Sequence, residues 1–239
     1  MRRLKNAKDE VPDFSFIIPS LNEGKYIGRC LNSINKQRES KEIIVVDSYS
    51  KDDTVKIAKK YGARVLYEGR KGPAVARNTG AKAANGRILV FPDADTKFDT
   101  NFLTKLKQEY ENSKAGGGIF RLTFFDPRGY SDIFFFKVWN KIVKFLNAVG
   151  FTFTNGTCFT YRKDIFNKVG GFNSKLLTNE DHDLAIRISK YSRIRMFDIT
   201  VYTTVRRLER LGAIKFLKLQ AKATLNYFLF QRSLPEYWQ

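Results

Sequence analysis

The sequence predicts an α/β fold with a Rossmann-like, mostly parallel central sheet and helices on both of its faces. Two observations lead to this prediction. Short apolar runs alternate with segments of helical spacing between residues 14 and 91, and each run is almost continuously apolar. Strands of that kind are buried on both faces, as in parallel sheets covered by helices. Ligands of such sheets bind beyond the carboxyl ends of the strands, so side chains at those ends are the first candidates for a site.

The N-terminal part of the chain contains four predicted strands with three predicted helices between them. The strands are expected at residues 14–19, 42–46, 63–67 and 88–91, and the helices at residues 22–34, 53–61 and 73–84. Gly62 and the pair Asn85-Gly86 follow the last two helices and are typical of helix C-termini. Pro19, Asp47 and Asp93 stand at strand ends, so we expect them to line one crevice.

The pattern changes after residue 115. Strands are expected at residues 115–125, 157–162 and 194–205, and helices at residues 131–149, 181–191 and 208–230. No internal repeat or low-complexity linker is visible. We therefore expect one domain over residues 1–205, with a nucleotide-binding half at about 13–98 and an acceptor half at about 99–205, followed by an amphipathic helical appendage over 206–239.

Composition narrows the choice of partner. The 239 residues include 43 Lys+Arg against 24 Asp+Glu, a net charge of +19 that favours nucleic acid, nucleotide phosphates or anionic lipid. Cys30 and Cys158 stand in apolar contexts without metal-ligand spacing and are expected to be buried free thiols. No window of 18 residues is free of charge, and the basic N-terminus lacks the apolar segment of a signal peptide. These features predict a cytoplasmic protein.

Two acids follow the fourth predicted strand in the stretch FPDADT, residues 91–96. Carboxylates are the ligands that Mg²⁺ and Mn²⁺ prefer, and these cations bridge diphosphates. An ordinary solvated turn is the alternative, because aspartate is common in turns. Asp47 in the same crevice and the basic stretch 69–72 leading to Arg77 favour a metal together with a phosphate pocket.

Five segments together resemble the family 2 inverting glycosyltransferases, which have the GT-A fold. They read FSFIIPSLNEGKYIGRCLNSI, EIIVVDSYSKDDT, GPAVARNTGAKAANGRILVFPDADT, GTCFTYRKDIFNKVGGF and NEDHDL, and they follow the order of that family. The resemblance covers roughly residues 13–190. It implies that a sugar is moved from a UDP- or GDP-linked donor with a divalent cation, Mg²⁺ or Mn²⁺, on the diphosphate. The QxxRW motif of processive synthases is missing, which favours a single transfer.

The same resemblance implies roles for individual residues. Those implied in donor binding are Pro19, Ser20, Asn22, Glu23, Asp47, Lys71, Gly72, Arg77 and Asp93. Asp95 is implied as the direct metal ligand, with Asp93 beside it. Asp47 is expected to face the base.

The later motifs supply the candidate chemistry. Asp181, with Glu180 before it, is implied as the catalytic base, because inversion needs a carboxylate that takes a proton from the acceptor hydroxyl. The alternative is that these acids only stabilise a helix N-terminus. His182 is expected to be structural. Arg206 and Arg207 are expected either to close over the diphosphate or to form a basic cap before a helix.

Two predicted helices carry the clue to the acceptor. Lysines line one side of each, with aromatic and aliphatic residues over the rest; the lysines are Lys137, Lys141 and Lys144 in one helix and Lys215, Lys218 and Lys222 in the other. Such helices lie in membrane interfaces, aided by anionic lipid, or pack on a core or a partner subunit. We expect a lipid-linked acceptor, such as polyprenyl or dolichyl phosphate or a lipid-linked glycan, reached from the cytoplasmic face of the membrane. The oligomeric state stays open.

Two other classes remain as alternatives. A nucleotidyltransferase acting on a sugar phosphate also uses paired acids and a metal, but its Gly-rich basic loop near the first strand is replaced here by PSLNEG. A basic nucleic-acid-binding protein would fit the charge, but the aromatic residues stand in apolar runs and are not interleaved with basic residues on a strand face. We therefore expect no nucleic acid partner.

Overall fold

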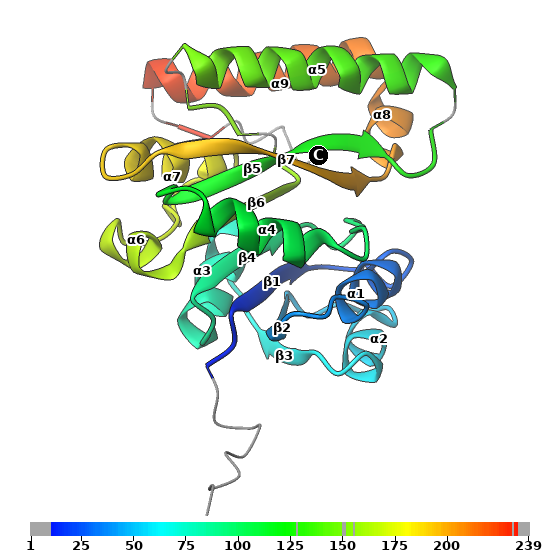
Figure 1. The fold of residues 1–239 in the computed structure, drawn as a ribbon. Helices are drawn as coiled ribbons and strands as arrows, with labels where there is room; N and C mark the ends of the chain where they lie inside the picture. Colours follow the sequence, from blue (N-terminus) through cyan, green and yellow to red (C-terminus); the bar gives the residue numbers. More distant parts are fainter. Residues whose placement is uncertain (1–10, 128, 150–151, 155, 231, 234–239) are drawn as a thin grey trace, which may run out of the picture.

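The computed structural model describes residues 11–233 apart from residues 128, 150–151, 155 and 231, and it describes the backbone alone at Ser131, Arg207, Leu208, Ala213 and Ile214. Its centre is a mixed sheet with the strand order β3-β2-β1-β4-β6-β5-β7 and helices on both faces (Figure 1). The strands are β1 (Phe14–Ser20), β2 (Lys41–Asp47), β3 (Arg64–Tyr67), β4 (Ile88–Pro92), β5 (Gly117–Phe124), β6 (Cys158–Arg162) and β7 (Ile194–Thr203). The helices are α1 (Ile27–Asn35), α2 (Thr54–Lys60), α3 (Pro73–Ala83), α4 (Phe102–Glu111), α5 (Tyr130–Ala148), α6 (Lys163–Lys168), α7 (Glu180–Ser189), α8 (Arg206–Leu211) and α9 (Ala213–Phe230). The α/β fold is confirmed.

The first four strands form the parallel part of the sheet. β1 pairs with β2 and β4, and β2 pairs with β3, all in parallel. The apolar residues of β1 and β2 are buried on both faces, as predicted for strands without alternation, whereas β3 lies at the edge of the sheet and its Tyr67 is exposed. The register places Ser20 beside Asp47 and Asp47 beside Tyr67, so the polar ends of these strands meet at one edge.

The other strands make the sheet mixed. β6 runs antiparallel between β4 and β5, and β5 pairs in parallel with β7. The register of β6 sets Cys158 opposite Pro92, and the backbone N–H of Asp93 donates to the carbonyl of Thr157 at 2.9 Å. The chain that enters β6 therefore lies against the predicted metal-binding turn.

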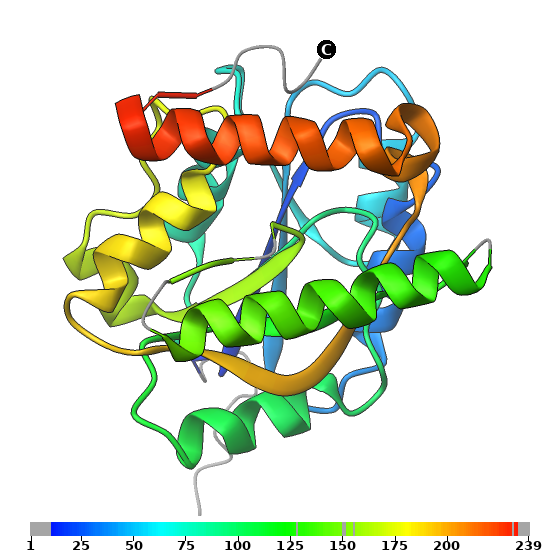
Figure 2. The same cartoon turned by 90° about the horizontal axis from the view of Figure 1, so that it is seen from above.

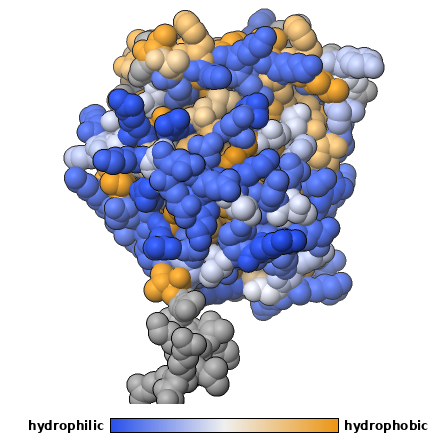
Figure 3. Space-filling view, viewed as in Figure 1, coloured by the Kyte–Doolittle hydropathy of each residue, from blue (hydrophilic) through white to orange (hydrophobic). Residues whose placement is uncertain are grey.

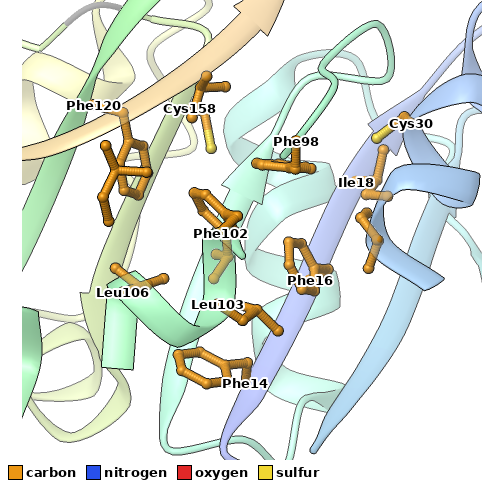
Figure 4. Close-up of a cluster of buried hydrophobic side chains, with 14 of the residues drawn as sticks. Phe14, Phe16, Ile18, Cys30, Phe98, Phe102, Leu103, Leu106, Phe120 and Cys158 are labelled. Carbon is orange, nitrogen blue, oxygen red and sulfur yellow. The ribbon is translucent and has the colours of Figure 1, made fainter. Parts of the chain in front are cut away.

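Two apolar clusters fill the space on either side of the sheet. One contains Phe16, Phe98, Phe102 and Phe120 together with both cysteines, which are free thiols as predicted (Figure 4). The other gathers aromatic side chains under α3, α6 and α7, including Phe91, Phe159, Tyr161, Phe166 and Phe172. These packed layers make the carboxyl edge of the sheet a firm base for a site.

Several predicted boundaries are wrong for local reasons. The predicted helix at 22–34 begins only at Ile27, because Asn22 has a φ of 55° and residues 21–26 form a loop. The predicted helix at 208–230 is two helices, because Gly212 adopts a φ of 73°. Helices α4 and α6 were not predicted. The division of the chain into two halves and an appendage stays a prediction.

Helices α5 and α9 run across the same side of the molecule (Figures 1 and 2). Within the described residues, no helix is both long and apolar enough to cross a bilayer. Apolar side chains gather on this side of the surface (Figure 3). The exposed ones include Phe134, Val138, Ile142, Phe145 and Val149 of and after α5 and Leu217, Leu225, Phe228, Leu229 and Phe230 of α9. We call these ten residues the apolar face.

The apolar residues of α5 are divided between the core and the surface, which the helix pattern predicted from the sequence did not distinguish. Phe136 and Val143 are buried against the body of the protein, so α5 has a core side as well as an exposed apolar side. Asn140, on the same helix, pairs with the backbone of Leu122 on β5 through bonds of 2.8 and 3.0 Å. Trp139 is half-buried and stacks on Phe135. The predicted apolar residue Ile214 has no described side chain.

Candidate active site

Arg77 joins the two predicted acidic motifs. It projects from α3, is 3% exposed, and places its Nη2 3.0 Å from Asp93 Oδ1 and its Nη1 2.5 Å from Glu180 Oε1. Its guanidinium also lies 5.1 Å from the ring centre of Phe159 and 5.8 Å from that of Phe172. A single buried cation therefore connects the turn after β4 with the first turn of α7.

Asp95 is held by residues that come after β7. Thr204 Oγ1 donates to Asp95 Oδ2 at 2.6 Å, and Arg206 Nε lies 2.9 Å from the same oxygen. The two Nη atoms of Arg206 donate to the Glu23 carboxylate at 2.7 and 3.0 Å, and the guanidinium lies over the ring of Tyr26. Arg206 therefore connects two predicted site residues from the ends of β1 and β4.

The candidate base Asp181 lies in a buried polar cluster. Thr154 Oγ1 donates to its Oδ2 at 2.5 Å, and His182 Nδ1 lies 3.2 Å from its Oδ1. Burial alone would raise the pKa of Asp181, but His182, the Thr154 hydrogen bond and nearby Arg77 together hold that pKa below its ordinary value. Burial raises the pKa of Glu180, and Arg77 opposes this shift. Asp181 is thus ionised at neutral pH.

Asp47 is fully buried, and its carboxylate is used within the protein. It accepts hydrogen bonds from Ser20 Oγ at 3.0 Å, from Ser50 Oγ at 2.6 Å and from the Ser50 backbone N–H at 2.8 Å. Nearby, Asn22 Oδ1 accepts from the Lys51 backbone at 2.9 Å, and Pro19 is half-buried on β1. These bonds shape the loops after β1 and β2. Contact of Asp47 with a base stays a prediction.

Glu68 anchors the loop that carries Lys71 and Gly72. Its carboxylate accepts from Arg70 Nε and Nη2 at 2.9 and 2.8 Å and from Thr79 Oγ1 at 2.7 Å. These bonds, the Arg70 side chain first, lower the pKa of Glu68 to about 2. Lys71 is exposed, and Gly72 has a φ of 117°, a conformation that favours glycine. The loop is thus firmly based while its lysine faces solvent.

Helix α9 rests on the start of α7. Tyr227 Oη donates to Asp183 Oδ1 at 3.1 Å, and Asn179 Nδ2 donates to the carbonyl of Ala223 at 3.0 Å. Asp183 also accepts from Arg187 Nη2 at 2.6 Å. The segment Asn179–Asp183, which contains the candidate base, is therefore held by the C-terminal helix.

Asp93 and Asp95 suit a divalent cation that takes only part of its ligands from the protein. Among the described residues no group of three or more His, Cys, Asp or Glu side chains is placed to bind a metal. Mg²⁺ commonly takes one or two carboxylates from the protein and completes its shell with substrate phosphates and water. Two carboxylates at the end of β4 suit that mode of binding, and they would hold the cation together with a diphosphate.

The structure brings seven of the fourteen predicted site residues together. Those in contact through the two arginines are Glu23, Arg77, Asp93, Asp95, Glu180 and Arg206, with Asp181 next to Glu180. The side chain of Arg207 lies outside the described residues. Thr154, Thr204 and Tyr227 support the site acids, although the sequence patterns do not single them out. No local motif marks them, because their partners are distant along the chain.

Known proteins resemble this chain in sequence and in fold. Residues 15–170 match the family described as glycosyl transferase family 2. The glycosyltransferase AglE of Haloferax volcanii is 36% identical over 94 residues, which are 36% of this chain and 31% of AglE. The chain thus matches less than a third of the length of that relative.

Two solved structures share the fold. Staphylococcus aureus TarS 1-349 in complex with UDP-GlcNAc superposes with a TM-score of 0.68 at 24% identity, over 91% of this chain and 73% of TarS 1-349. The mannosyltransferase PcManGT of Pyrobaculum calidifontis, in complex with GDP-Man and Mn²⁺, gives a TM-score of 0.67 at 19% identity, over 90% of this chain and 65% of its own. At these identities the likeness concerns the fold.

Proposed function

Because the chain belongs to glycosyl transferase family 2 and has the GT-A fold, we propose that it transfers one sugar from a UDP- or GDP-linked donor to a lipid-linked acceptor, with inversion and with Mg²⁺ or Mn²⁺. The observation that carries the proposal is the Arg77 bridge, which sets the acid pair after β4 beside the acids of α7. The family match favours this function over a nucleotidyltransferase or a nucleic-acid-binding protein.

Asp181 has the properties that the proposed reaction needs. It takes the proton of the acceptor hydroxyl while the acceptor oxygen forms a bond to the anomeric carbon. The bond from that carbon to the diphosphate breaks, and its electron pair leaves with the nucleoside diphosphate. Thr154 and His182 hold the Asp181 carboxylate in place for this step. The cation, when held by Asp93 and Asp95, supplies positive charge for the departing diphosphate.

Two classes of donor are compatible with the comparisons, uridine and guanosine diphosphate sugars. TarS was crystallised with UDP-GlcNAc and PcManGT with GDP-Man and Mn²⁺, and the present chain resembles both folds to a similar degree. We therefore propose a uridine or guanosine diphosphate sugar. The exposed Lys71 beside Gly72 and the half-buried Arg206 are the described cations that we propose to approach the donor phosphates.

The acceptor is inferred from the apolar face. Its exposed aromatic and aliphatic side chains lie beside exposed lysines of α5 and α9, namely Lys137, Lys141, Lys144, Lys215, Lys218 and Lys222. Apolar side chains flanked by lysines are the pattern of a surface that enters anionic lipid. We propose that the protein binds the cytoplasmic face of a membrane, where a lipid-linked acceptor is presented to the site.

The proposed function is tested by sugar transfer. Radiolabelled UDP- and GDP-sugars are incubated with the protein, Mn²⁺ and a membrane lipid extract, and the lipid products are separated by thin-layer chromatography. One donor should label a lipid product, and chelation of the cation should abolish the label. Transfer that proceeds fully in the chelator would contradict the metal dependence. Labelling of water-soluble acceptors alone would contradict the lipid acceptor.

A further inference from the structure

Arg206 contacts Asp95, the carboxylate that we propose to bind the divalent cation. Its Nε is 2.9 Å from Asp95 Oδ2, and its two Nη atoms are 2.7 and 3.0 Å from the Glu23 carboxylate. The two acids are only 17% and 7% exposed at Glu23 and Asp95, and Arg206 itself is 37% exposed. The guanidinium therefore neutralises these two shielded acids from the solvent side.

This placement opposes cation binding to Asp95. A divalent cation on that carboxylate would sit within a few ångströms of a positive guanidinium in a site largely shielded from water, where like charges repel strongly. Burial raises the pKa of Glu23, and Arg206 acts against that shift. Arg206 thus already compensates the negative charge of both carboxylates.

Arg206 is also placed so that it can change partners. It is the first residue of α8, and only Thr204 and Val205 separate it from β7, so its side chain can turn away from Asp95 without unwinding the helix. Thr204 would still donate to Asp95 Oδ2 and keep the carboxylate oriented. A diphosphate arriving at the site is an acceptor that suits the guanidinium fork, and phosphate pairs with arginine in bidentate fashion.

We propose that Arg206 makes binding of the divalent cation conditional on the nucleoside diphosphate. Without nucleotide, Arg206 stays on Asp95 and Glu23, and the cation binds weakly. With nucleotide, the added negative charge holds both the cation and Arg206, and the cation binds tightly. The inference rests on the proposed function, since it assumes that Asp95 is the metal ligand. By linkage, the cation must raise nucleotide affinity by the same factor as the nucleotide raises cation affinity.

The test measures Mn²⁺ binding by electron paramagnetic resonance of the free ion, without a sugar donor, in the absence and presence of UDP or GDP. In the parent protein, nucleotide should increase Mn²⁺ affinity. Arg206→Gln should bind Mn²⁺ alone at least about fivefold more tightly than the parent, the lower end of typical coupling factors. The increase produced by nucleotide should shrink by the same factor.

Three controls make the outcome specific. Arg195→Gln removes the same charge at an exposed position on β7 and should leave both Mn²⁺ affinities at parent values. Arg206→Met removes the charge but keeps a long unbranched side chain, and it should repeat the Arg206→Gln result if Arg206→Gln melts at a much lower temperature than the parent. Asp95→Ala should lose Mn²⁺ binding with and without nucleotide.

The outcomes separate the two proposals. Unchanged or weaker binding of Mn²⁺ alone in both Arg206 variants overturns the role of Arg206, because the arginine would then orient the ligand and not oppose the cation. Parent-like Mn²⁺ binding by folded Asp95→Ala overturns the metal site itself, and the inference about Arg206 with it.

Discussion

At Arg77, one buried guanidinium compensates acids from two distant parts of the chain. Removing it leaves Glu180 buried without a partner, and breaking such a pair on one side typically costs about 3–5 kcal/mol. We predict that Arg77→Met lowers the free energy of unfolding by that amount in urea titrations. Arg87→Met is the matched control, because Arg87 pairs with Asp13 but is 73% exposed, and exposed pairs contribute at most about 1 kcal/mol. Equal losses of unfolding free energy in the two variants would show that the buried ion pairs of Arg77 stabilise the protein no more than an exposed pair does.

At Asp181, the expected effect is on chemistry and not on donor binding. Asp181→Asn keeps the shape of the side chain but removes the proton acceptor. Turnover should fall by roughly 10²-fold or more, the range typical of lost general-base catalysis. Donor affinity measured by calorimetry should stay near the parent value. Asp164→Asn, an exposed acid in the first turn of α6, is the control and should turn over normally. A folded Asp181→Asn protein with parent turnover would contradict the assignment.

At Glu68, the expected effect is a pH dependence of stability. The pKa of Glu68 is lowered from 4.5 to about 2, mainly by Arg70, so the folded state favours the ionised form. The resulting stabilisation is fully present above about pH 4.5 and is lost as pH falls toward about 2. Glu68→Gln should therefore lower the melting temperature at pH 7, and its difference from the parent protein should shrink as the pH falls toward about 2. A difference that grows on acidification would mean that the pKa shift has the opposite sign.

At the scale of elements, the sequence predicts most strands and misses contacts that only the tertiary fold creates. Apolar runs identify β1, β2 and β4, and the polar residues at their ends lead to Asp93 and Asp95. Phe102, Leu103 and Leu106 have the spacing of one helix face and could have predicted α4. They follow the more conspicuous acidic motif at residues 91–96, and the helix was not predicted. The antiparallel direction of β6 has no such local signal, because an apolar run of this length fits either direction.

The same reasoning explains the candidate site. The basic residues 206 and 207 are conspicuous in the sequence. The ion pair of Arg206 with Glu23 cannot be predicted from local patterns, because the two residues are 183 positions apart. Thr204 reaches Asp95 over 109 positions and belongs to no motif. Residue types that recur in a family motif could thus be predicted, whereas the side chains that hold them in place could not.

Helix α5 allows a direct test of membrane binding. Phe134 and Phe145 are 66% and 65% exposed, so replacing both with Ser should leave the core intact. We predict that the double variant sediments much less with anionic liposomes than the parent, and that salt weakens the binding of the parent because exposed charges are screened beyond about 8 Å at physiological ionic strength.

The controls address folding and specificity. Tyr191→Ser removes an aromatic side chain that is 58% exposed beyond the end of α7, and it should bind liposomes like the parent. Thermal melting should show that the double variant is as stable as the parent. Undiminished sedimentation of the folded double variant would rule out this part of the apolar face as a membrane contact.

At the scale of the whole molecule, α9 and the candidate active site depend on each other. Tyr227 is buried and donates to Asp183, two positions after the candidate base. Tyr227→Phe keeps the ring and removes the hydrogen bond, which should cost about 1 kcal/mol of unfolding free energy, since Arg187 still pairs with Asp183. Tyr202→Phe removes a similar bond of 3.3 Å to Asp99 at the surface and should cost less. A larger loss in Tyr202→Phe would contradict this view of α9.

The long sequence separations within the site also determine when it can form. Arg77 and Glu180 are 103 positions apart, and Asp95 meets Thr204 only after the whole of β5, β6 and β7 has been placed. Contacts of such high order are slow to form, and chains emerging from the ribosome fold their N-terminal parts first. During synthesis, β1 to β4 can associate with Asp93 already beside Arg77 of α3, while Asp95 still lacks Thr204 and Arg206, which come from later segments. Asp95, the candidate metal ligand, is therefore among the last of the candidate site acids to be stabilised during folding.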